Sequence, residues 1–167
     1  MMISRYEKII KRKIRESRLF KKNGLVNVVG VYSNTLEFTI DTINKINKKF
    51  NLNLKLNIEV YGNLEDINLN DKEKSVLIIP IEGVFLYFLL SNMNNSMVYP
   101  ISEKTEKYFN ISYYISEYHL SRYLNKEPKL VSNNKEILSF IYSIISRNEK
   151  YSSSLAKSIN YLVRFLG

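Results

Sequence analysis

The stretch that decides the fold runs from residue 25 to residue 50 and has the sequence LVNVVGVYSNTLEFTIDTINKINKKF. Its first part, residues 25–30, is apolar and β-branched, which is typical of a strand buried on both faces of a parallel sheet. Apolar residues then recur at helical spacing as far as Phe50. A strand, a tight loop and a helix in this order predict the opening of an α/β nucleotide-binding domain, because the N-terminus of such a helix attracts phosphate.

The rest of the chain favours a Rossmann-like parallel sheet with helices on both faces. Further strands are expected at residues 51–60, 75–79 and 97–101, and helices at residues 3–20, 82–90, 112–124 and 152–166. A helix capped by Ser132 or Asn133 is expected to run to Ile145. The alternation of strands and helices implies right-handed crossovers, with a helical C-terminal part. In the last helix the expected inward residues are Leu155, Ile159, Leu162, Val163 and Phe165.

The composition excludes several classes of protein. A chain of 167 residues suits a single domain. Because it contains no cysteine, it holds no disulfide, thiolate metal site, cysteine nucleophile or cysteine-bound iron–sulfur cluster. Its one histidine, His119, leaves little for metal binding, and no metal site or cofactor is expected. The N-terminus is too charged for a signal peptide and the longest apolar run is too short to span a bilayer, so we expect a cytoplasmic protein.

Positive charge is concentrated at the N-terminus. The whole chain carries a net charge of +9, and residues 1–22 combine nine basic side chains with only two acidic ones. Apolar residues Tyr6, Ile9, Ile10 and Ile14 recur at helical spacing within this segment, so we expect a basic helix at residues 1–22 that packs on an α/β domain at residues 23–167. Such a segment is typical of a polyanion contact. The alternatives are a solvated helix face, and a contact with an acidic protein or membrane surface. The basic residues are Arg5, Lys8, Lys11, Arg12, Lys13, Arg15, Arg18, Lys21 and Lys22.

The two ends of the chain resemble the PP-loop ATPases that thiolate tRNA. In that family a helix of the form RYxKxIKRxIRxxxLFKKxD leads into a strand, then into SGGKDS and a second helix. The present sequence has SRYEKIIKRKIRESRLFKKNGLVNVV at residues 4–29, then GVYSNT and LEF. The family also ends with a lysine–tyrosine step and an L-R-S-F-like helix. Here Lys150 and Tyr151 precede Leu155, and Lys157 takes the place of the family's arginine.

The sequence departs from the family at the residues that bind phosphate and carry out catalysis. The family's glycine pair wraps pyrophosphate and its lysine offsets phosphate charge. In this chain the position of the SGGKDS motif is taken by Gly30, Val31, Tyr32, Ser33, Asn34 and Thr35. Only Gly30 permits close backbone approach, and no Lys or Arg lies between Lys22 and Lys45. The family's catalytic cysteines have no counterpart in a chain without cysteine.

The resemblance therefore implies a retained fold with a degenerate nucleotide loop. It implies a noncatalytic subunit that pairs with an active tRNA-thiolating paralogue, or with itself, and helps to bind tRNA through the basic segment and Lys157. One alternative is a stand-alone basic nucleic-acid-binding protein on a Rossmann-like scaffold. An enzyme with a divergent nucleotide site is disfavoured, because these residues supply no nucleophile, metal cluster or phosphate cradle.

Other conspicuous residues have structural alternatives. Ser33, Asn34 and Thr35 suit helix capping better than ligand contact. His119 suits packing better than catalysis, and a magnesium site from Glu82 with Asp71 or Glu73 competes with ordinary solvated acids. Aromatic residues are expected in the core and at a partner interface rather than in base stacking, namely Tyr108, Phe109, Tyr113, Tyr114, Tyr118 and Tyr123.

Overall fold

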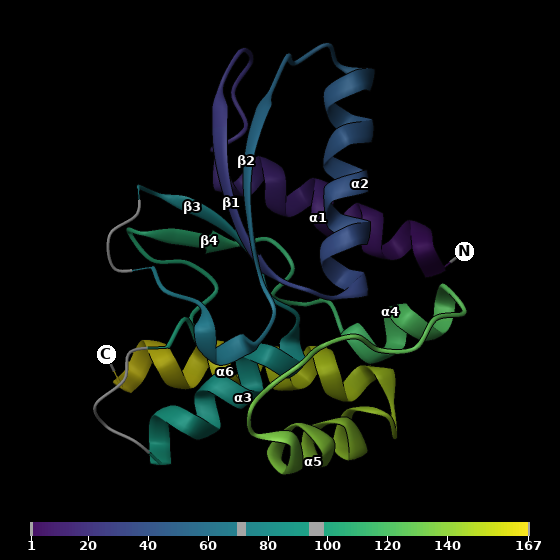
Figure 1. Cartoon of the computed structure of the whole chain (residues 1–167), viewed down its shortest axis with the longest axis vertical. Helices are drawn as coiled ribbons and strands as arrows, with labels where there is room; N and C mark the ends of the chain where they lie inside the picture. The colour runs from purple at the N-terminus through teal and green to yellow at the C-terminus, as the bar shows by residue number, and fades with distance from the viewer. Residues whose placement is uncertain (1, 70–72, 94–98, 167) are drawn as a thin grey trace.

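The fold is the expected α/β arrangement, a parallel sheet with helices on both faces (Figure 1). The structure is a computed structural model that describes residues 2–69, 73–93 and 99–166. The strands are β1 (Leu25–Val31), β2 (Lys55–Tyr61), β3 (Ser75–Ile78) and β4 (Tyr108–Asn110). The helices are α1 (Met2–Ser17), α2 (Asn34–Lys49), α3 (Ile81–Met93), α4 (Glu117–Tyr123), α5 (Lys135–Ile145) and α6 (Glu149–Leu166), and η1 (Leu64–Asp66) is a short 3₁₀ helix.

The strand order is β2-β1-β3-β4, and all pairs are parallel. Val28 lies opposite Ile58 in β2, and Val29 lies opposite Leu77 in β3. The connections leave β1 and β3 toward opposite sides of the sheet, so the carboxyl ends of these two strands form the topological switch point. In open α/β sheets the crevice at that point is where ligands bind.

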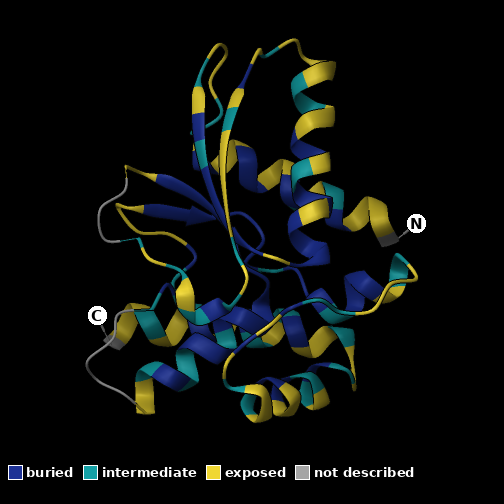
Figure 2. Cartoon of the chain, viewed as in Figure 1, coloured by how far each residue is buried: buried dark blue, intermediate teal, exposed yellow. Residues whose placement is uncertain are grey.

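Helices α1, α2 and α4 cover one face of the sheet. The apolar stripe of the basic helix is buried there as expected, with Tyr6 3%, Ile10 0% and Ile14 7% exposed. These side chains share a cluster with Val28 and Ile78 from the sheet. The basic helix is therefore packed on the α/β body along its apolar stripe, which fixes the direction of its charged side chains. Figure 2 shows this alternation of buried and exposed residues along the helices.

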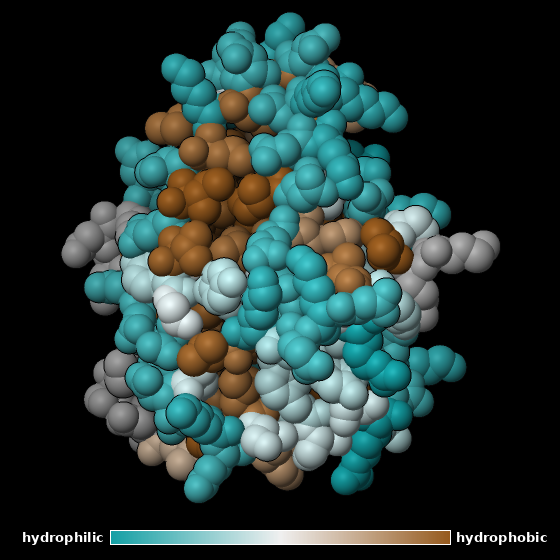
Figure 3. Space-filling view, turned by 45° about the vertical axis from the view of Figure 1, so that its right-hand side comes forward, coloured by the Kyte–Doolittle hydropathy of each residue, from teal (hydrophilic) through white to brown (hydrophobic). Residues whose placement is uncertain are grey.

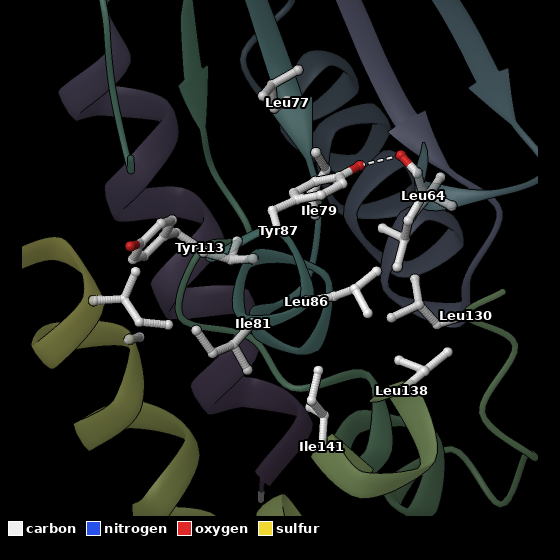
Figure 4. Packing of buried hydrophobic residues seen from close by; sticks show 14 of the residues in the cluster. Leu64, Leu77, Ile79, Ile81, Leu86, Tyr87, Tyr113, Leu130, Leu138 and Ile141 are labelled. Atoms are coloured by element: carbon white, nitrogen blue, oxygen red, sulfur yellow. Dashed lines mark hydrogen bonds between the residues drawn. The ribbon is translucent and has the colours of Figure 1, made fainter. Parts of the chain in front are cut away.

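Helices α3, α5 and α6 pack on the other face. Tyr87 is almost fully buried at the centre of this cluster, and its hydroxyl donates a hydrogen bond to the Leu64 carbonyl (Figure 4). Gly83 lies where a Cβ would come within 2.8 Å of Ile79 and of Leu64. A larger residue at this position would therefore require the Ile79 and Leu64 side chains to shift.

The expected fourth strand at residues 97–101 is wrong. Residues 97 and 98 lie outside the described residues, and residues 99–101 are not a strand. The fourth strand is β4, where Phe109 pairs with Val76 of β3. Three residues are too few to show an alternating pattern, so β4 owes its place to pairing with β3 rather than to local sequence.

Several helix boundaries also differ from the expected ones. The helix expected from residue 112 begins only at Glu117, because the Ser116 side chain caps it. Helix α1 ends at Ser17, because Arg18 adopts a left-handed conformation with φ 56°. Helix α5 begins after Asn134, which lies one residue beyond Asn133 and two beyond Ser132 and makes no capping hydrogen bond through its side chain. In α6, Leu162 and Phe165 are 42% and 71% exposed rather than facing inward, because Ala156 and Ile159 form its buried face.

Candidate functional site

The loop between β1 and α2 caps the helix and allows it to pack closely against the sheet. Ser33 caps α2, since its Oγ accepts a hydrogen bond from Leu36 N at 3.0 Å, which confirms the capping interpretation. A Cβ on Gly30 would lie 2.7 Å from Leu36 Cδ1 and 3.2 Å from the Ile78 carbonyl oxygen. Gly30 thus lets α2 and β3 approach β1. Tyr32 follows and is 47% exposed.

A carboxylate from α4 occupies the N-terminus of α2. Glu117 is fully buried, and its two oxygens accept five hydrogen bonds. Oε1 accepts from Asn34 N at 3.0 Å, from Ser121 Oγ at 3.2 Å and from Lys129 N at 3.0 Å. Oε2 accepts from Thr35 N at 2.8 Å and from Thr35 Oγ1 at 2.7 Å. The backbone N–H groups that a phosphate would use at a helix N-terminus are already bound to this side chain.

The first turn of α2 carries a second carboxylate that is also paired within the chain. Glu37 accepts from Lys126 Nζ at 3.1 Å and from Lys129 Nζ at 2.8 Å, and hydrogen bonds from these lysines lower the pKa of Glu37. Lys129 Nζ also lies 5.1 Å from the centre of the Tyr32 ring. Lys126 and Lys129 are therefore both engaged by Glu37, and the segment that carries them lies against the loop.

A second buried glutamate fixes the position of Glu117. Glu82, in the first turn of α3, accepts hydrogen bonds at the start of α4 from Ser116 Oγ at 2.6 Å, Glu117 N at 2.9 Å and Tyr118 N at 3.1 Å. Burial raises the pKa of Glu82 to about 7, although these hydrogen bonds act to lower it. Glu82 of α3 thus binds the N-terminus of α4, and Glu117 of α4 binds the N-terminus of α2.

The start of α5 is bound by a third glutamate in the same manner. Glu65 accepts from Asn133 N at 3.1 Å, from Asn134 Nδ2 at 2.8 Å and from Ser132 Oγ. Burial acts to raise the pKa of Glu65, but the hydrogen bonds from Ser132 and Asn134 outweigh it and the pKa is lowered. Helices α2, α4 and α5 therefore all begin against a glutamate of the same chain. Sequence reasoning missed these contacts, because each joins residues that are far apart along the chain.

The expected nucleic-acid contacts of the N-terminal segment are exposed, with one exception. Some form ion pairs at the surface, namely Arg5 with Glu149 at 3.4 Å, Lys11 with Glu7 at 3.4 Å and Arg12 with Glu16 at 3.6 Å. The exception is Lys13, which is only 6% exposed and is paired with Glu16 at 2.7 Å and with the buried Glu103. The exposed residues are Arg5, Lys8, Lys11, Arg12, Arg15, Arg18, Lys21 and Lys22.

The C-terminal half of α1 borders a basic cleft of about 670 Å³. Its lining includes two basic residues from elsewhere in the chain, Lys104 and Arg164, which were not among the expected contacts. Lys157 is exposed on α6, two turns before Arg164 on the same side of the helix, but does not line the cleft. The lining combines six basic side chains with two acidic ones, and consists of Arg12, Lys13, Arg15, Glu16, Arg18, Glu103, Lys104, Phe109 and Arg164.

Other candidate residues have structural roles. The His119 ring lies 2.9 Å from the Ile145 carbonyl through Nε2 and is packed against the Tyr118 ring. Tyr108, Phe109 and Tyr113 are in the core. Glu82 binds the N-terminus of α4 and Glu73 is exposed, while Asp71 lies outside the described residues. Within residues 2–69, 73–93 and 99–166, no three histidine or carboxylate side chains are grouped to hold a metal ion.

None of the helices in the described ranges combines the length and apolar character needed to span a bilayer. Comparisons of the chain with protein-family models, with curated proteins and with solved structures find no match.

Proposed function

We propose that this chain is a noncatalytic PP-loop-like subunit that binds tRNA through α1 and the basic cleft and pairs with an active tRNA-thiolating paralogue. The observation that carries the noncatalytic part is the Glu117 carboxylate at the N-terminus of α2. The basic cleft supports the RNA part. The thiolation role rests on the resemblance of the two ends of the sequence to the PP-loop family.

A nucleotide phosphate cannot bind at the β1–α2 loop without displacing Glu117. Displacement would strip a buried carboxylate of five hydrogen bonds and leave it beside an arriving anion. The two lysines that the structure places beside the loop, Lys126 and Lys129, are already paired with Glu37. Micromolar affinity for ATP corresponds to about 8 kcal/mol of binding free energy, for which this loop supplies no source.

The basic cleft suits a phosphate backbone better than bases. Arg15 of α1 and Arg18, which follows α1 directly, line the same cleft as Lys104 and Arg164. Cations from three separate segments therefore converge on it. Phe109 is the one aromatic residue in the lining and is only 6% exposed, so it offers little surface for base stacking. Contacts of this kind position a nucleic acid without specifying its sequence.

The alternative function is a stand-alone nucleic-acid-binding protein. It rests on the basic cleft and on the positive charge of residues 1–22, and it requires no paralogue. The two functions differ in one observation, which is copurification of a cysteine-bearing PP-loop protein from the native cell. Its presence supports the paired subunit, and its absence with RNA binding intact supports the stand-alone protein.

The RNA contact is tested by charge reversal in the cleft. The triple variant Arg15→Glu, Arg18→Glu and Lys104→Glu is compared with a control triple that changes the exposed Lys48, Lys49 and Lys55 to Glu. We expect the cleft variant to bind tRNA at least about tenfold more weakly at low salt. For this variant the slope of log K against log salt concentration should become less steep by about two. Each of the three lost phosphate contacts contributes about 0.7 to that slope for a single strand.

The measurement is fluorescence anisotropy with labelled tRNA at two salt concentrations, together with calorimetry of the wild type with Mg–ATP. Equal loss of affinity in both triple variants would show that only net charge matters and would contradict a specific cleft. Micromolar binding of Mg–ATP would reject the noncatalytic assignment.

A further inference from the structure

Strand β2 leaves an open, apolar edge on the sheet. It is the terminal strand in the order β2-β1-β3-β4, and among the described residues no strand pairs with its outer side. Ile58 is 41% and Val60 50% exposed, although both lie in the strand interior. Figure 3 shows apolar atoms gathered in the upper half of the molecule, where β1, β2 and α2 lie. Natural proteins usually protect such an edge, because it is a template for another strand.

The backbone groups at this edge belong to the even-numbered residues. Lys55 N donates to the Gly24 carbonyl at 3.0 Å, and the Tyr61 carbonyl accepts from Tyr32 N at 2.8 Å, so the odd-numbered residues of β2 direct their polar groups to β1. Because successive residues of a strand alternate, the N–H and C=O groups of Leu56, Ile58 and Val60 point away from the sheet. Their side chains lie on the face that carries Val26 and Val28, by the register of β1 with β2.

We propose that two copies of this chain pair their β2 strands antiparallel around a two-fold axis at Ile58, which joins the two sheets into one. This pairing places Ile58 opposite itself and Leu56 opposite Val60, so every outward N–H and C=O group of these three residues finds a partner. The exposed apolar side chains then cover one another on a single face. A two-fold axis gives a closed, self-complementary interface.

The charges of β2 fit this register. Asn57 lies opposite Glu59, and Lys55 lies opposite Tyr61, so no like charges face each other across the axis. An axis one residue later would place Glu59 opposite itself. An axis at Asn57 would require Leu54 to pair with Val60, but Leu54 N already donates to Asn47 Oδ1 at 3.0 Å and its carbonyl accepts from Asn47 Nδ2 at 3.3 Å. The strand therefore fits a second copy of itself best around Ile58.

The first test is the mass of the full chain by sedimentation over a range from micromolar to several hundred micromolar. We expect the wild type to sediment at twice the monomer mass of 19.7 kDa. The variant Ile58→Lys should weaken self-association at least about tenfold, because it places two ammonium groups face to face. The matched control is Tyr161→Lys, which changes a 62% exposed aromatic residue on α6 and should leave the dimer intact. Far-UV circular dichroism checks that both variants are folded.

The second test fixes the register, using the fact that the chain has no cysteine. Directly opposed residues that exchange hydrogen bonds in an antiparallel pair, as the two copies of Ile58 would, have Cα atoms about 5.5 Å apart, within the range that a disulfide bridges. Ile58→Cys should therefore give a covalent dimer on mild oxidation. Asn57→Cys should not, because its copies would lie two residues out of register.

A wild type that remains monomeric at every concentration would overturn the proposal, as would one that pairs through β2 only with a different protein. A dimer that survives Ile58→Lys but is lost in Tyr161→Lys would place the interface on α6 instead. A covalent dimer from Asn57→Cys but not from Ile58→Cys would overturn the Ile58 register.

Discussion

Replacing Glu117 by glutamine tests the central contact of the molecule. The amide can present its oxygen on one side only. The better orientation keeps the bonds from Asn34 N and Lys129 N and turns the NH₂ group toward Thr35. Thr35 Oγ1 can rotate to accept from the amide, but the buried Thr35 N–H cannot and loses its acceptor.

The cost follows from these contacts. A buried donor without a partner costs about 1–3 kcal/mol. Loss of a negative charge at a helix N-terminus costs about 0.3–1 kcal/mol, and up to about 2 kcal/mol where the site is partly buried. We therefore expect Glu117→Gln to lower the free energy of unfolding by about 3 kcal/mol. In a chain of this size the change lowers the melting temperature by about 6 to 12 °C.

The assay is urea unfolding and a thermal melt of the wild type and Glu117→Gln side by side. The matched control is Glu106→Gln, an exposed position that should change stability by less than about 0.5 kcal/mol. A loss of less than about 1 kcal/mol in Glu117→Gln would refute the idea that this carboxylate closes the N-terminus of α2.

Three further substitutions test neighbouring features. Burial raises the pKa of Glu82 to about 7, so between pH 4.5 and 7 the folded protein holds a proton that the unfolded chain releases. The contribution of Glu82 to the free energy of unfolding should therefore fall by about 3 kcal/mol as the pH rises through this range. Urea titrations of the wild type and Glu82→Gln across this range should show that slope only in the wild type, and equal slopes would contradict it. Lys13→Met should cost about 3–5 kcal/mol in urea unfolding, because it leaves the Glu103 carboxylate buried without its cation, and a neutral effect would mean that water reaches Glu103. Gly30→Ala should cost about 1–3 kcal/mol in a thermal melt, because its Cβ would lie 2.7 Å from Leu36 Cδ1 and 3.2 Å from the Ile78 carbonyl oxygen. An unchanged melting temperature would show that these neighbours give way without cost.

Local sequence was sufficient wherever a local interaction decides the structure. The apolar residues of β1 predicted a strand buried on both faces, and the structure confirms it beyond the first residues. Ser33 was recognised as a helix cap because the cap bonds a residue three positions away. The stripe of Tyr6, Ile10 and Ile14 was predicted to pack on the domain, because helical spacing of apolar residues can be recognised within one short segment.

Local sequence was insufficient for β2 and β4. The alternation of Leu52, Leu54, Leu56 and Ile58 predicted a strand, but it did not predict that this strand would lie at the edge of the sheet. The exposure of Ile58 and Val60 depends on the strand order. Strand β4 has three residues, and its place depends on pairing with β3.

The sequence by itself determined the α/β class, the basic helix with its buried stripe, and a segment at residues 30–35 that contains one glycine and no lysine or arginine. The tertiary structure alone decided what occupies the N-terminus of α2. Glu117 lies 82 residues beyond Thr35 along the chain, and Glu82 lies 35 residues before Glu117. A local pattern in the sequence does not predict contacts between residues so far apart along the chain. A glutamate in the chain has the same local pattern whether it is solvated or buried against a helix end, and only the packing of α3 and α4 against the sheet removes the water and brings the N–H groups to its carboxylate.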